Sequence, residues 1–464
     1  MKVATPPISW IPDTGVRLHA GPYASGVVQL RRRLTALDGQ PLRRLTSGPY
    51  GGIYTPPIHN FKRVYVNSAE HGVPFVGTTS MLHADFIGVP LLSREQAESD
   101  KLRVLRIREG MTLVSCSGTI GRTVYARSDM DGMWSSGDTL KIIPDEQRID
   151  PGYLHAFLSS AAGVAAMVAE TYGSIIPHIE ASHVAELPVP RLGHEIEERI
   201  GGLIRQAANA RSQARLALAQ AEQLLREHVL VPEYEHRSQD TRIVRASMLQ
   251  QRLDAYYFSA TCAHARRLFD GACSSKHAPL GELATVFIPG IFKRRYAGSI
   301  EHGYLYLTGA DVFQVAPSSD RYLMREVAED NQLIVTAGMI LVQEAGQLGG
   351  LIGHSVMVGS HFANTAVTNN MIRLACEQPE DTAYLYALLR TTEGVTLIAR
   401  ESAGSSIPHI DADRVRRVRI PWANEAIRKS IANEVLEALR LREKACVWES
   451  EARAFLDKVI EEVA

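Results

Sequence analysis

Cysteine is scarce in this chain, and long apolar runs are missing. The five cysteines are scattered over 464 residues without a Cys-x-x-Cys pair, which argues against a zinc site or a disulfide framework and favours reduced thiols. No stretch reaches the roughly 20 apolar residues that span a bilayer. Residues 1–7 contain no apolar segment like that of a signal peptide. We therefore expect a cytoplasmic protein with no membrane partner.

The chain also lacks an excess of charge of one sign. Its formal net charge is −1, with 22% charged and 45% hydrophobic residues, as in ordinary globular proteins. A near-neutral charge argues against a protein that coats nucleic acid regardless of sequence, but it permits a specific binder whose basic residues are clustered. A length of 464 residues predicts roughly two to four domains.

Motifs for catalysis are absent as well. The string Thr55–Ile58 lacks the polar first residue and the aromatic residue of a motif that holds a target amine. The glycine loop at 118–122 is not followed by Gly-Lys-Ser/Thr, so it does not predict a nucleotide site. Cys116 has no activating base nearby in the sequence, which favours a buried structural thiol. The sequence predicts a binding protein with no catalytic residue, no metal site and no cofactor of its own.

What the chain does contain is a long repeat. Two motifs of the first half return 231 residues later: Gly-Ser-Ile-Ile-Pro-His-Ile (173–179) as Gly-Ser-Ser-Ile-Pro-His-Ile (404–410), and Phe-Lys-Arg (61–63) as Phe-Lys-Arg (292–294). Blocks at 110–121 and 338–349 correspond at an offset of 228, which indicates loops of different length on one scaffold. Two like domains in one chain suit a two-part linear target such as duplex DNA.

Each copy has the pattern of a mixed α and β domain. Short apolar runs broken by Gly, Pro and Ser predict strands and turns, and an apolar face predicts a helix from Pro151 to about Tyr172. The expected fold is α+β, with two tandem mixed α/β domains that are each followed by a long α-helix. The expected boundaries are 1–192 for the first domain, 193–231 for its helix, 232–250 for a linker, 251–421 for the second domain and 422–464 for its helix.

The two long helices carry apolar seams with alternating steps of four and three residues. The first seam begins at Ile196 and Ile200, and the second at Ile427 and Ile431. A seam of this period over about five turns predicts coiled-coil pairing. We expect the two helices to pair antiparallel and to act as a strut between the domains. The alternative, in which each helix packs on its own domain, stays open.

The Gly-Ser…Pro-His block supplies candidate binding residues. They are Ser174 and His178 in the first copy and Ser405 and His409 in the second. Their hydroxyl and imidazole groups are suited to a phosphate or a base edge. The same pattern also describes a plain turn, with Gly at positive φ, Ser bonded locally and Pro before a strand. Both interpretations stay open.

The basic triplets supply the other candidates. Lys62 and Arg63 follow a phenylalanine in the first copy, and Lys293, Arg294 and Arg295 follow one in the second. Repetition of the same cations beside an aromatic residue favours contact with phosphate. The alternative is a solvated run of charge next to a core phenylalanine.

Taken in order, these motifs resemble the specificity subunits of type I restriction–modification systems. The resemblance lies in Gly-Met-Thr-Leu-Val-Ser-Cys-Ser-Gly-Thr-Ile-Gly (110–121), in Gly-Ser-x-x-Pro-His-Ile followed by an apolar strand and Pro, and in Arg-Leu-Asp-Ala-Tyr-Tyr (252–257). It covers nearly the whole chain. The first copy departs from the pattern, because its opening at 17–23 lacks the Asp. The family's Gln-x-x-Ile at the start of each spacer helix is also missing.

The resemblance implies a non-catalytic subunit with two target-recognition domains that binds double-stranded DNA. It would direct two adenine-N6 methyltransferase subunits, which carry S-adenosylmethionine and flip the target adenine, in a phage-defence system. Where such a system also cleaves, restriction subunits would bring ATP and Mg²⁺. Two alternatives stay open: the specificity component of another phage-defence modification system, and a duplicated adaptor that binds protein.

Overall fold

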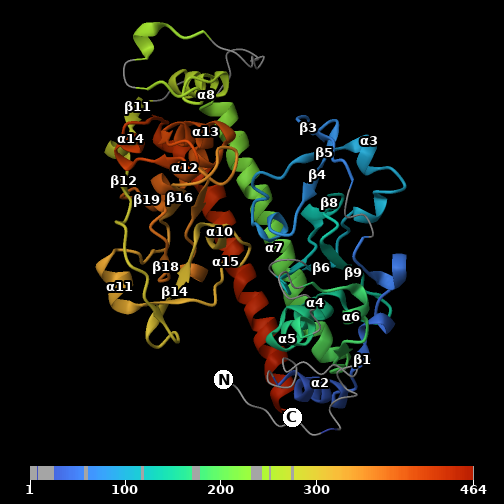
Figure 1. Cartoon of the computed structure of the whole chain (residues 1–464). Helices are drawn as coiled ribbons and strands as arrows, with labels where there is room; N and C mark the ends of the chain where they lie inside the picture. The colour runs from blue at the N-terminus through green and yellow to red at the C-terminus, as the bar shows by residue number, and fades with distance from the viewer. Residues whose placement is uncertain are drawn as a thin grey trace. The chain divides into compact units, whose positions relative to one another are not determined.

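Two units of like construction make up the chain (Figure 1). The structure, a computed structural model, describes residue 8 and residues 26–56, 61–116, 120–169, 178–230, 243–249, 252–272 and 276–462. Unit 1 comprises Met1–Ser212 with Lys444–Ala464, and unit 2 comprises Gln213–Glu443. Each unit therefore contains one of the two sequence copies together with part of each long helix. The expected domain boundaries stay predictions.

Unit 1 contains two four-stranded sheets among its described residues, ordered β2-β9-β6-β7 and β3-β5-β4-β8. The first consists of β2 (Ile53–Tyr54), β9 (Thr139–Ile142), β6 (Thr112–Ser115) and β7 (Thr123–Tyr125). The second consists of β3 (Tyr65–Val66), β5 (Leu91–Ser93), β4 (Gly72–Val76) and β8 (Trp134–Ser135). β1 (Gln40–Pro41) pairs with β10 (Pro188–Val189). The helices are α2 (Val27–Ala36), α3 (Arg94–Ala97), α4 (Pro151–Ser159), α5 (Ala161–Val168) and α6 (Ala181–Ala185).

Unit 2 repeats this plan, with sheets ordered β12-β19-β16-β17 and β13-β15-β14-β18. Their strands are β12 (Thr285–Phe287), β19 (Met371–Ala375), β16 (Ile340–Gln343), β17 (Ser355–Met357), β13 (Tyr296–Ala297), β15 (Tyr322–Met324), β14 (Gly303–Leu307) and β18 (Ala366–Val367). The other pairs are β11 (Lys276–Pro279) with β22 (Arg419–Trp422), and β20 (Ser402–Ala403) with β21 (His409–Ile410). The helices are α8 (Ala260–Asp270), α9 (Leu280–Leu283), α10 (Gly309–Val312), α11 (Arg325–Asp330), α12 (Pro379–Arg390), α13 (Thr392–Arg400) and α14 (Ala412–Arg416).

Strand register is the same in the two units. β6 pairs with β9 so that Leu113 lies opposite Lys141, and β16 pairs with β19 so that Leu341 lies opposite Arg373. All residues of β6, β9 and β16 are buried, as is all of β19 except its last residue. The repeat seen in the sequence is therefore a repeat of sheet order and of strand register.

Each domain is tied in the same way to the start of its long helix. The hydroxyl of Tyr153 donates to the carbonyl of Pro190 at 2.6 Å, and the hydroxyl of Tyr384 donates to the carbonyl of Pro421 at 2.8 Å. All of these tyrosine side chains are buried, and burial raises the pKa of both phenols. Each hydroxyl thus satisfies a carbonyl that has left the strand and not yet entered the helix.

The single helix expected from Pro151 to about Tyr172 is wrong, because the chain breaks at Ser160 between α4 and α5. The Ser160 hydroxyl donates to the Phe157 carbonyl at 2.8 Å and accepts from the Gly163 amide at 3.0 Å. One side chain therefore ends the first helix and caps the second. Thr391 does the same between α12 and α13. Apolar residues continue across the break, so periodicity does not reveal it, and the expected end at Tyr172 lies outside the described residues.

The expected antiparallel pairing of the long helices is confirmed. They are α7 (His194–His228) and α15 (Glu425–Glu462). In unit 1, the Arg199 guanidinium carbon lies 4.5 Å from the centre of the Phe455 ring. Further along α7, Arg211 forms two hydrogen bonds of 2.9 Å with Glu449, which lies earlier in α15. Because residue numbers rise along one helix and fall along the other, the helices run antiparallel.

Each unit builds its core from the domain and from both long helices. In unit 1 the helix residues in the core are Ile200, Ile204, Ala452, Leu456 and Ile460. In unit 2 they are Ala214, Ala217, Leu218, Ala221, Leu225, Ile431, Ala432, Val435 and Ala438. The alanines leave little side-chain bulk between the helices, so their backbones approach closely. The pairing decides between the two expectations for these helices, because neither packs on its own domain alone.

Each central sheet buries one cation at the same position. Lys141 and Arg373 are both fully buried. Arg373 donates to the carbonyls of Met371 at 2.7 Å and Val367 at 2.9 Å. The Lys141 amine has no hydrogen-bond partner among the described residues, and its nearest aromatic contact is the Tyr54 ring at 5.8 Å. Burial lowers the pKa of Lys141 to about 7, so the first copy holds a cation that the second copy satisfies better.

Candidate nucleic-acid interface

The first basic triplet precedes β3, at one edge of the second sheet of unit 1. Lys62 and Arg63 are both exposed. The Arg63 guanidinium lies over the Phe61 and Phe75 rings, at 5.7 and 5.3 Å from their centres. Gln96 holds the backbone, because its amide donates to the Lys62 carbonyl at 2.7 Å and accepts from the next residue but one. The two cations are therefore fixed on an aromatic support and face solvent.

The second triplet precedes β13 and occupies the same place in unit 2. The Arg294 guanidinium donates to the Tyr306 hydroxyl at 3.3 Å, and this hydrogen bond raises the pKa of Arg294. Lys293 is exposed. Arg295 pairs with Glu326, so its charge is already balanced within the protein.

The two triplets share one construction. Phe75 on β4 and Tyr306 on β14 are 231 residues apart, and each supports the arginine of its own triplet. Phenylalanine supports its arginine through the ring face, whereas tyrosine adds a hydrogen bond. Of the five predicted basic residues, the equivalent pairs Lys62 with Lys293 and Arg63 with Arg294 are the ones that the fold repeats.

The Gly-Ser…Pro-His block is only partly described. Ser174 lies outside the described residues, and His178 is half-buried next to a strand bridge. In unit 2 the block forms a turn between β20 and β21, in which Gly404 has a φ of 119° and Ser405 is exposed. His409 pairs with Ala403 across the two strands. The turn interpretation is therefore confirmed for the second copy, and a role in binding stays a prediction.

His409 is held by a carboxylate. Its Nδ1 lies 2.9 Å from Glu344 Oε1, and the His409 side chain is 57% exposed while that of Glu344 is 11% exposed. Because Glu344 occupies Nδ1, Nε2 is the ring nitrogen left for a ligand. In unit 1 the position of Glu344 is taken by Cys116: the Ile179 amide donates to the Cys116 carbonyl, as the Ile410 amide donates to that of Glu344. The carboxylate is thus particular to the second copy.

Cys116 is a buried thiol, as expected from the sequence. Its sulfur donates to the Asp138 carbonyl at 2.6 Å. Burial raises its pKa to about 11, which disfavours the reactive thiolate. Cys116 therefore belongs to the core.

The structure does not bring the two kinds of candidate residue together in unit 2. The triplet borders the sheet β13-β15-β14-β18, whereas β21 is bridged to the residue pair after β16, in the other sheet. No hydrogen bond or ion pair among the described residues links Lys293, Arg294 or Arg295 to Ser405 or His409. The candidates thus form two separate patches.

Sequence analysis missed a third cluster of cations in unit 2. Arginines from three segments line one pocket: Arg252, Arg266, Arg400, Arg414, Arg417 and Arg419. The run Asp-Arg-Val-Arg-Arg-Val-Arg at 413–419 was a visible signal. Arg400 comes from the end of α13, however, and its proximity to the others depends on the fold.

Metal and membrane features are limited to what the described residues allow. Among these residues, no group of three or more His, Cys, Asp or Glu side chains is placed to hold a metal ion. None of the helices described is both long enough and apolar enough to cross a membrane.

Comparison with known proteins gives similar structures but no sequence family. No protein-family model and no curated protein matches the chain. The S subunit of a type I restriction-modification system from M. genitalium is 11% identical, with 91% of this chain and 95% of that chain covered and a TM-score of 0.35. The HsdS subunit from Thermoanaerobacter tengcongensis is 13% identical, with coverages of 92% and 96% and a TM-score of 0.29. A structure of a type I R-M system is 13% identical, with coverages of 91% and 95% and a TM-score of 0.30. At this level of similarity, the functional case depends on the residues of this chain.

Proposed function

We propose that this chain is the non-catalytic specificity subunit of a type I restriction–modification system. Each unit would read one half of a bipartite site in double-stranded DNA. The chain would direct two adenine-N6 methyltransferase subunits, which carry S-adenosylmethionine, to that site. In a system that also cleaves, restriction subunits with ATP and Mg²⁺ would join the same complex.

One observation carries this proposal: the same cationic patch is built twice on the same sheet. Lys62 with Arg63, and Lys293 with Arg294, stand at equivalent positions beside an aromatic residue of the neighbouring strands. Exposed cations on a fixed support suit phosphate, which lies at regular intervals along a duplex. Two equivalent patches in one chain match a target with two halves.

Reading of bases would fall to the loops, which differ between the copies. The strands and their register are the same in both units, but the offset between equivalent blocks slips from 231 to 228 around the glycine-rich loop. Loops carried by a common scaffold are where recognition varies most freely. The two halves of the DNA site would therefore differ in sequence.

A domain exchange tests the proposal. Residues 17–190 are replaced by the equivalent segment of a related protein, and the DNA site is determined by methylome sequencing of cells that express the complex. One half of the site should change and the other should remain, because each unit reads its own half. A site altered in both halves would contradict this division of labour.

Binding to a random duplex separates the proposal from a protein-binding adaptor. A DNA-binding chain should bind with an affinity that falls steeply with salt, by a log–log slope of about −0.9 for each phosphate contacted. An adaptor should show no such binding. The full chain is the right material, because both long helices contribute to the core of each unit.

A further inference from the structure

The arginine pocket of unit 2 is a second place where cations gather, apart from both candidate patches. We use this name for the pocket lined by Arg252, Arg266, Arg400, Arg414, Arg417 and Arg419 together with Asp270 and Glu401. Its volume of about 500 Å³ falls within the range of small-molecule sites. Six guanidinium groups face two carboxylates, so the lining carries an excess of positive charge.

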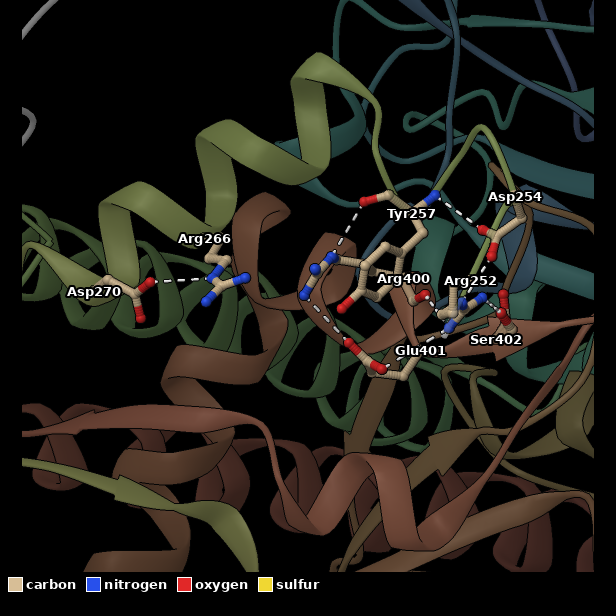
Figure 2. A network of polar contacts seen from close by, with 8 residues as sticks. All are labelled: Arg252, Asp254, Tyr257, Arg266, Asp270, Arg400, Glu401 and Ser402. Carbon is tan, nitrogen blue, oxygen red and sulfur yellow. Dashed lines mark hydrogen bonds and ion pairs between the residues drawn. The ribbon is translucent and has the colours of Figure 1, made fainter. Parts of the chain in front are cut away.

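One wall of the pocket is rigid and already satisfied (Figure 2). The guanidinium carbons of Arg400 and Arg252 lie 3.6 and 4.5 Å from the centre of the Tyr257 ring. Arg400 also donates to the Tyr257 carbonyl at 3.2 Å and to Glu401 at 3.3 Å. Arg252 donates to Asp254 at 2.7 Å. These two arginines build the wall, and their hydrogen bonds are taken within the protein.

The arginines of the last segment are less satisfied. Nη1 of Arg414 is buried and has no hydrogen-bond partner among the described residues. The Arg417 guanidinium is exposed and makes no ion pair or side-chain hydrogen bond with any residue that the structure describes. A buried, unpartnered donor on a charged group is costly. An anion in the pocket would remove that cost and balance the excess charge.

The first copy does not share this pocket. At the offset of 231 residues, Arg414, Arg417 and Arg419 correspond to His183, Glu186 and Pro188. α6 and α14 are equivalent helices of the same length, so the fold does not need the arginines. Glu186 even pairs with Arg43 in unit 1. The arginines are therefore an addition to one unit and not part of the repeated framework.

We propose that the arginine pocket binds the phosphate group of a larger molecule, with Arg414 and Arg417 as its ligands. Guanidinium groups match the oxygens of phosphate through paired, charge-assisted hydrogen bonds. The volume leaves room for more than a lone ion. Two sources share this chemistry: a nucleotide free in solution, and the backbone of nucleic acid. The proposal does not depend on the proposed function.

The test measures binding of two probes by the full chain at constant ionic strength: pyrophosphate by calorimetry, and a random duplex by fluorescence anisotropy. The variant carries Arg414→Gln with Arg417→Gln. The control carries Lys429→Gln with Arg440→Gln, which removes the same charge from exposed residues of unit 2 that pair within their own helix. If the double variant does not fold, Arg417→Gln alone replaces it, because that side chain is exposed.

We expect the variant to bind at least one probe about tenfold more weakly than the wild type, and the control to bind like the wild type. Loss confined to pyrophosphate identifies a free phosphorylated ligand, and loss confined to the duplex identifies the nucleic-acid backbone. A wild-type chain that binds neither probe, or a variant that binds both as well as the wild type does, overturns the proposal. Pocket-dependent binding of pyrophosphate without any binding of duplex would support the pocket and contradict the proposed function.

Discussion

At the scale of single residues, the surroundings of a charge decide what it can do. Arg63 and Arg294 rest on aromatic side chains and keep their charge toward solvent, whereas Arg295 is paired with Glu326. Lys141 has the opposite situation, because it is buried without a hydrogen-bond partner among the described residues. Cations of the same formal charge therefore have different uses in this protein.

Replacement of the exposed cations should weaken binding to every DNA sequence. Lys62→Ala with Arg63→Ala should lower affinity for specific and random duplexes alike and should reduce the salt slope by about one to two, as loss of phosphate contacts does. Arg295→Ala should have a smaller effect, because Glu326 already balances that charge. Fluorescence anisotropy at several salt concentrations measures both quantities. An unchanged slope in the double variant would mean that these residues are merely solvated.

Burial of Lys141 should make stability depend on pH. Burial lowers its pKa from 10.5 to about 7, so above pH 7 the unfolded chain binds a proton that the folded chain does not. The free energy of unfolding should therefore rise between about pH 7 and 8.5, by up to about 2 kcal/mol. Above pH 9 the raised pKa of Cys116 acts in the opposite direction.

Urea unfolding at pH values across this window measures the effect, and two variants serve as controls. Lys141→Met should flatten the dependence, because it keeps the side-chain volume without the titrating group. Lys141→Arg should also flatten it, since the Arg373 guanidinium shows how an arginine binds carbonyls at this position. A Lys141→Met protein that kept the full rise would show that another group is responsible.

At the scale of elements, close contacts between helices are set by glycine. Gly201 and Gly202 stand side by side in α7. A Cβ atom on Gly201 would overlap the Asp150 carboxylate, which caps α4 by accepting from the Tyr153 amide at 2.8 Å and pairs with Arg205. A Cβ atom on Gly202 would meet nothing nearer than Arg205 Nη2 at 4.0 Å.

Alanine substitution should therefore have opposite effects at these two neighbouring positions. Gly201→Ala should destabilise the protein by about 2 kcal/mol through overpacking and loss of the cap. Gly202→Ala should stabilise it by about 0.5–1 kcal/mol, because alanine loses less conformational freedom than glycine in a helix. Urea unfolding of the two variants gives the comparison. Effects of the same sign would contradict the close contact between α4 and α7.

At the scale of the whole molecule, duplication and the shared helices act together. The core of each unit contains residues of both α7 and α15, and the division between the units falls within both helices, at Ser212 in α7 and at Glu443 in α15. A change of helix length at these two points would leave the residues inside each unit unaltered.

Lengthening both helices should change the spacing of the DNA site under the proposed function. Seven residues inserted after Ser212 and seven after Glu443 add about 10 Å of helix and keep the seams in phase. The gap between the half-sites should lengthen by about three base pairs, while the bases read in each half stay the same. Methylome sequencing checks both. An insertion in the expected linker at 232–250 is the control, and a gap unchanged in an active double insertion would mean that the helices do not set the spacing.

The sequence by itself determined the repeat, the mixed fold of each copy and the pairing of the long helices. A constant offset requires two copies of one fold, and an apolar seam of fixed period requires a partner along its length. It could not predict the break at Ser160, because that break depends on one hydroxyl rather than on a periodic pattern. Only the tertiary structure decided that Arg295 is neutralised, that Lys141 is buried and that residues near 252, 400 and 417 meet in one pocket. Pairing and burial arise between segments far apart in the chain, and no local pattern records which segments will meet.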